Sequence, residues 1–145
     1  MTITILPIPL PRVATRVYFV IQNRLKESAK KKAFLINALA KDVYEGTSTS
    51  SFGRPGHIPA SHSQPFYELL EDDYFLDPEL LQQKLTEQNM LGEETVTIYC
   101  GGGIAATINA FACHLMGKDS VSIYDGSLTD WNSSANRPIK LGSEP

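Results

Sequence analysis

Cysteine is scarce in this sequence, with only two among 145 residues. Two cysteines are too few for a disulfide framework, so we expect both thiols to be free in a reducing, cytoplasmic compartment. No apolar run approaches the roughly 20 residues that a membrane span requires. The segment 1–13 also lacks the charged start and small-residue cleavage site of a signal peptide. These absences predict a protein that is not secreted and has no membrane partner.

Positive charge is also in short supply. The net charge is −3 at pH 7, and the only basic run, Lys30–Lys32, is short enough to be the solvated end of a helix. We therefore expect no nucleic acid among the partners. Hydrophobic residues make up 42% of the chain and charged residues 20%, which is ordinary for a soluble protein. The length suits one domain with a real core.

Helix patterns alternate with strand patterns along the chain, which predicts a mostly parallel sheet with helices on both faces. Asp77 and Pro78 mark a helix start, and Gly46 and Gly117 mark helix ends. In the helix that ends at Gly117, the apolar spacing predicts a core face of Ile108, Phe111, Ala112 and Leu115. The expected helices cover 15–28, 40–46, 65–73, 76–89 and 106–117, the expected strands cover 32–39, 95–99 and 120–124, and 47–65 reads as loop.

The stretch VTIYCGGGIAAT, residues 96–107, places Cys100 between a strand and a helix. Ligands collect at the carboxyl ends of parallel strands. Successive backbone N–H groups in the glycine run can form a concave nest, and a helix N-terminus favours negative charge. Glycines also allow close backbone approach and positive φ angles. This corner therefore suits an anionic sulfur on Cys100, although a buried and inert cysteine would fit the same position.

Two other sites fit parts of this stretch. Gly101, Gly103 and Ala106 match the spacing of a dinucleotide-binding turn, and Asp125 ends the next strand. Too few residues follow Asp125 for the strands that such folds add. A cysteine phosphatase loop would need arginine where Ala106 stands, because a guanidinium binds phosphate through two bonds.

The histidines of the loop offer a further site. A metal site of His57, His62 and Cys100 is weakly supported by spacing, and His57 is better interpreted as a residue that fixes a turn.

Three motifs together resemble the rhodanese family of single-cysteine sulfurtransferases: RPGHIPAS at 54–61, VTIYCGGGIAAT at 96–107 and YDGSLTDWN at 124–132. The resemblance is strongest to the catalytic module of thiosulfate and 3-mercaptopyruvate sulfurtransferases. It implies an open α/β domain with a central, mostly parallel five-stranded sheet and helices on both faces. The domain would span 14–142, with an N-terminal extension at 1–13 and a tail at 143–145.

The resemblance also implies a reaction and its site. Cys100 would carry a persulfide between a small anionic donor, such as thiosulfate or 3-mercaptopyruvate, or another persulfide, and a thiol, cyanide or protein acceptor. Arg54 would meet the anionic group of the donor. No metal and no organic cofactor would be needed, and the protein would be a monomer or weak homodimer. The cradle around the sulfur would be formed by Gly101, Gly102, Gly103, Ile104 and Ala105.

Several positions depart from the family pattern. Asn37 stands where the family usually has an aspartate, Leu39 replaces an arginine, and Ala60 replaces a glycine. The changes at Asn37 and Leu39 leave open an alternative function, a rhodanese-like module that binds a partner with little turnover.

Overall fold

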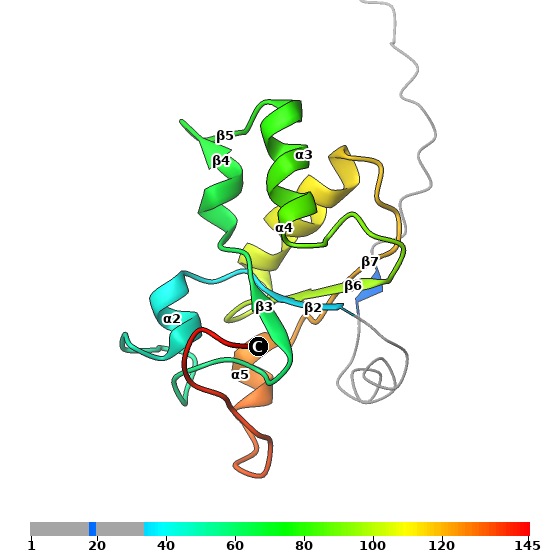
Figure 1. Ribbon diagram of the computed structural model, residues 1–145. Coiled ribbons are helices and arrows are strands. Elements are labelled where there is room, and N and C mark those ends of the chain that lie inside the picture. The colour runs from blue at the N-terminus through cyan, green and yellow to red at the C-terminus, as the bar shows by residue number, and fades with distance from the viewer. Residues whose placement is uncertain (1–17, 20–33) are drawn as a thin grey trace, which may run out of the picture.

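A parallel sheet organises the part of the chain that this computed structural model describes, residues 18–19 and 34–145 (Figure 1). Every pair of neighbouring strands in it is parallel, and helices flank it on both sides. The predicted α/β architecture is therefore confirmed. In spatial order the strands are β1 (Tyr18–Phe19), β7 (Val121–Ile123), β6 (Val96–Tyr99), β2 (Phe34–Asn37) and β3 (Ser61–Ser63).

The helices after β6 and β7 leave the sheet on opposite faces. In Figure 1, α3 (Pro78–Glu87) and α4 (Ile104–Leu115) lie on one side, and α5 (Ser127–Trp131) lies on the other. Because β6 and β7 are neighbours, their carboxyl ends open a crevice between the diverging helices, as in other open α/β sheets. Cys100 directly follows β6 at this crevice.

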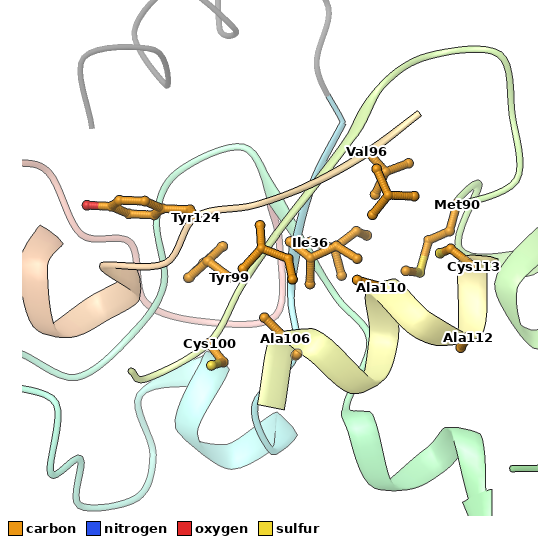
Figure 2. Close-up of a cluster of buried hydrophobic side chains, with 14 of the residues drawn as sticks. Ile36, Met90, Val96, Tyr99, Cys100, Ala106, Ala110, Ala112, Cys113 and Tyr124 are labelled. Carbon is orange, nitrogen blue, oxygen red and sulfur yellow. The ribbon is translucent and has the colours of Figure 1, made fainter. Parts of the chain in front are cut away.

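Buried aliphatic side chains of the central strands form the core. Ile36 and Ile98 are fully buried in β2 and β6, and Leu81 and Leu85 of α3 pack into the same core, as the sequence predicts. In Figure 2, Ala106 and Ala110 of α4 face the strands around Ile36. Small side chains on this helix face allow α4 to approach the sheet closely, which places the start of α4 next to the end of β6.

The predicted core face of α4 is largely wrong. Phe111 and Leu115 are 51% and 46% exposed, and the buried positions include Ala106, Asn109 and Ala110. Of the predicted face only Ala112 is fully buried. The large apolar residues share a helical spacing, but the close contact with the sheet selects the face with small side chains.

Two predicted helices also differ from the structure, as does the predicted loop over 47–65, in which Ser61–Ser63 forms strand β3. Tyr18–Phe19, expected inside a helix over 15–28, forms strand β1 and pairs with β7; the rest of that range lies outside the described residues. The range 65–73 contains only a short 3-10 helix, η1 (Phe66–Leu69), followed by the hairpin of β4 (Leu70–Glu71) and β5 (Tyr74–Phe75). Asp72 and Asp73 have φ angles of 48° and 66°, as a tight hairpin turn requires.

Helix α2 (Lys41–Glu45) ends at Gly46, as predicted, in a left-handed conformation. No helix within the described residues has the length and apolar character to cross a membrane.

His57 fixes the turn of the GHIP motif, as predicted. Its ring nitrogens lie 2.8 Å from the carbonyl oxygen of Tyr44 and 3.0 Å from that of Glu144. The ring also stacks on Tyr44 with a centroid distance of 3.8 Å. On the far side of the turn, Tyr99 accepts the N–H of Ile58 at 3.0 Å. The motif is thereby tied to α2, to the C-terminal segment and to the residue that precedes Cys100.

Ala60 carries backbone strain in this turn, because its φ angle is +64°. We expect Ala60→Gly to raise the free energy of unfolding by about 0.5–1 kcal/mol, since relief of the left-handed conformation exceeds the added entropy of glycine in the unfolded chain. The Ala60 side chain is exposed, so no packing is lost. Denaturant unfolding measures the change. Ala135→Gly is the control, because Ala135 is exposed and its φ is not positive; equal losses of stability in both variants would contradict the strain at Ala60.

Candidate active site

Cys100 lies between the end of β6 and the start of α4, with 2% of its surface exposed (Figure 2). The backbone N–H of Gly103 donates a hydrogen bond to its Sγ over 3.1 Å. Gly103 reaches this position with a φ angle of +93°, and a Cβ there would lie 2.8 Å from the carbonyl oxygen of Asp125. Glycine is therefore required at 103 for the loop to direct an N–H at the sulfur.

The three glycines of the loop are not equivalent. A Cβ on Gly101 would lie 2.2 Å from the ring of Phe52, so this ring packs directly on the loop backbone. Gly102 has no positive φ, and a side chain there would meet open space. Close backbone approach and a positive φ angle, the two reasons for glycine in this loop, therefore do not apply at Gly102.

The first turn of α5 holds the loop from behind. Leu128 donates its N–H to the carbonyl of Cys100 over 3.1 Å, and Thr129 donates its N–H to the carbonyl of Gly101 over 3.0 Å. In a planar trans peptide the N–H points opposite to the C=O. The N–H groups of Gly101 and Gly102 therefore point away from α5, and the N–H that contacts Sγ is that of Gly103.

Ser127 is a site residue that the sequence analysis missed. Its Oγ accepts the N–H of Cys100 over 3.0 Å, donates to the carbonyl of Tyr124 over 2.8 Å and lies 3.9 Å from Sγ. The hydroxyl has one proton, and the shorter contact to Tyr124 takes it. Ser127 is fully buried and has a φ angle of +49°. The serine in DGS, directly after a strand end, was the available signal.

A cavity of about 360 Å³ opens in front of the loop. Of the predicted site residues, it brings together Cys100, Gly101, Gly102, Ile104 and Ala105. The other lining side chains were not among the predicted site residues, and all of them are apolar. They are Leu39, Phe52, Phe66 and Ile108.

Backbone contacts bring these distant segments together. Ala38 donates its N–H to the carbonyl of Tyr99 over 2.9 Å, and Phe66 donates its N–H to the carbonyl of Ala38 over the same distance. Asn132 donates its side-chain N–H to the carbonyl of Phe52 over 2.8 Å. Leu39, Phe66 and Phe52 are thus positioned around Cys100 by tertiary contacts that leave no local sequence pattern.

Arg54 is not among the residues that line the cavity. Its guanidinium donates to the carbonyl of Ser134 over 3.2 Å and contacts that of Ala135 at 3.5 Å. Its role toward a donor remains a prediction.

The metal site of His57, His62 and Cys100 has no support. Within 18–19 and 34–145, no group of three or more His, Cys, Asp or Glu residues is arranged to hold a metal ion. Both ring nitrogens of His57 are already engaged, and His62 stacks on Phe34.

Family comparison agrees with this geometry. The model of the rhodanese-like domain matches residues 23–134. The chain belongs to the rhodanese-like domain family.

Relatives of the rhodanese-like chain include named sulfurtransferases. Thiosulfate/3-mercaptopyruvate sulfurtransferase 2 of Arabidopsis thaliana is 32% identical over 81% of this chain and 35% of its own length. Human 3-mercaptopyruvate sulfurtransferase is 30% identical over 83% of this chain and 41% of its own length. The crystal structure of the Tum1 protein of Saccharomyces cerevisiae superposes with a TM-score of 0.74 and 23% identity, covering 88% of this chain and 47% of Tum1. The chain thus spans less than half the length of each of these relatives.

The two cysteines should differ strongly in reactivity. Cys113 is fully buried, and this burial raises its pKa to about 12. Cys100 adjoins the cavity and receives the N–H of Gly103. We expect iodoacetamide at pH 7 to alkylate Cys100 at least about tenfold faster than Cys113, because the thiolate is the reacting species. Peptide mass spectrometry of the folded protein gives both rates, and equal rates would count against the cradle.

Proposed function

We propose that this chain is a sulfurtransferase that moves a sulfane sulfur through a persulfide on Cys100. The observation that carries the proposal is the N–H of Gly103 on Sγ, in a loop that turns its other N–H groups away from α5. The family relatives named as sulfurtransferases support it. Backbone donors of this kind stabilise negative charge without reorganisation during the reaction.

The proposed reaction has two balanced steps. In the first, the Cys100 thiolate attacks the outer sulfur of the donor and the new S–S bond forms. The bond between that sulfur and the rest of the donor breaks, and the rest of the donor leaves with the electron pair. In the second, an acceptor nucleophile attacks the same outer sulfur, and Cys100 leaves as the thiolate. No external oxidant or reductant is needed, since each step exchanges one bond of sulfur for another.

The chain's own residues have distinct parts in these steps. The N–H of Gly103 stabilises the anionic sulfur, and the start of α4 adds the partial positive charge of a helix N-terminus. Ser127 is a positioning residue, because it holds the backbone N–H of Cys100 at the strand end. Leu128 and Thr129 keep the loop in the orientation that serves the sulfur.

Thiosulfate, 3-mercaptopyruvate and organic persulfides are the candidate donors. Thiols, cyanide and protein thiols are the candidate acceptors. Two free cysteines are consistent with a reducing compartment, for which the cytoplasm is our proposal.

Intact-mass spectrometry tests the proposal most simply. After incubation with a panel of these donors, the wild type should gain the mass of one sulfur atom and lose it again on addition of cyanide. Cys100→Ser should gain none, and Cys113→Ala should behave like the wild type because Cys113 lies outside the site. Ser127→Ala should still gain the sulfur but about tenfold or more slowly, since a buried backbone N–H loses its acceptor.

A wild-type protein that gains no sulfur from any donor would contradict the proposal. That result would favour a rhodanese-like module that binds a partner without turnover.

A further inference from the structure

We propose that the sulfur donor of this protein carries a hydrocarbon group, aliphatic or aromatic, beside its sulfane sulfur, and that the cavity wall around Leu39, Phe66 and Ile104 selects it. The inference rests on the proposed function and specifies its substrate class: organic persulfides and thiosulfonates, in preference to thiosulfate.

The wall of the cavity is apolar. Every side chain that lines it, apart from the Cys100 thiol, is a hydrocarbon. The described chain contributes neither a charged side chain nor a side-chain hydroxyl, amide or imidazole to this lining. A ligand pocket of this size normally holds a few polar groups that orient a polar substrate. Here the backbone of the cysteine loop supplies the polar contacts, so the rest of the ligand contacts hydrocarbon side chains.

Charge also limits which donors the cavity can hold. The loop can stabilise the negative charge on one sulfur, next to Sγ. A dianionic donor such as thiosulfate would bring a second charge against Leu39 and Phe66, where burial without a partner is strongly unfavourable. Arg54 is the cation of the RPGHIPAS motif. Its guanidinium donates to the carbonyls of Ser134 and Ala135 and does not line the cavity.

Hydrogen bonds hold the apolar wall in place. Leu39 donates its N–H to Oδ1 of Asn37 over 2.8 Å, and its side chain is only 9% exposed. Phe66 is anchored by its bond to Ala38. The apolar wall is therefore built into the end of β2 and the start of η1. These residues are fixed in place and do not rearrange to expose polar groups to an anion.

The entrance of the cavity has the same character. Ile104, the first residue of α4, is 82% exposed yet lines the cavity next to the loop. Ile108, one helical turn further, continues the wall. A site that binds anionic donors would be expected to have a polar residue at this helix start. Ile104 instead extends the hydrocarbon surface from the sulfur to the solvent.

Thiosulfonates test the proposal with matched chemistry. Benzenethiosulfonate and methanethiosulfonate carry the same charge and the same sulfane sulfur. With each, the Cys100 thiolate forms the S–S bond, the donor S–S bond breaks, and a sulfinate leaves with the electron pair. They differ only in the hydrocarbon group. We expect kcat/KM for persulfide formation to be at least about tenfold higher with the phenyl donor, because burial of the ring contributes binding. Thiosulfate should be slower than both.

Two single-residue variants locate the selection. Ile104→Lys places a cation at the cavity entrance at an exposed position that the fold tolerates. It should raise kcat/KM for thiosulfate severalfold and reduce the preference for the phenyl donor. Leu115→Lys adds the same charge to the same helix outside the lining and should leave both values unchanged. Intrinsic reactivities of the donors toward a small thiol, measured in parallel, correct for chemical differences.

The outcomes separate this inference from the proposed function. Corrected rates that are equal for the methyl and phenyl donors, or a preference for thiosulfate, would overturn the inference while the persulfide mechanism stands. Equal effects of Ile104→Lys and Leu115→Lys would also overturn it, because the selection would not lie in the cavity. If no donor adds sulfur to Cys100, the proposed function fails and the inference fails with it.

Discussion

The site depends on two hydrogen bonds between α5 and the cysteine loop. Leu128 and Thr129 donate to the carbonyls of Cys100 and Gly101, which are adjacent peptide groups. Because each peptide is planar, fixing these carbonyls on one side fixes the following N–H groups on the other. A loop of three glycines has many accessible conformations, and the two bonds to α5 hold one in which the N–H of Gly103 contacts the sulfur. The crevice between β6 and β7 is where α4 and α5 diverge, so the fold itself brings these two elements together.

Unusual backbone conformations also occur at the same place. Gly103 and Ser127, the residues on either side of Sγ, both have positive φ angles. A non-glycine residue such as Ser127 costs about 1–2 kcal/mol in this conformation. The buried bonds of its hydroxyl to Cys100 and Tyr124 offset that cost. Residues held in such conformations are typical of functional sites, where the surrounding structure over-determines them.

Sequence patterns predicted the features that arise locally. The ends of α2 and α3, the strand before Cys100 and the loop after it follow from capping residues, apolar runs and glycine. The face of α4 was mistaken because the apolar spacing of Phe111 and Leu115 is as regular as that of the buried Ala106 and Ala110. Of the hydrocarbon wall, the sequence analysis singled out only Leu39, which stands where the family has an arginine. Leu39, Phe52 and Phe66 reach Cys100 through contacts across the sheet and the loops, which no local pattern encodes.

The amide NMR spectrum of the protein before and after persulfide formation on Cys100 tests the central claim most directly. A second sulfur on Sγ places the negative charge against the loop, and hydrogen bonds to an anion move amide proton signals downfield. The account predicts downfield shifts for the amides of Gly101, Gly102 and Gly103, with no change at Gly117 at the far end of α4. Unchanged loop amides on a protein that carries the extra sulfur would show that the loop does not hold the anion, and would contradict the account.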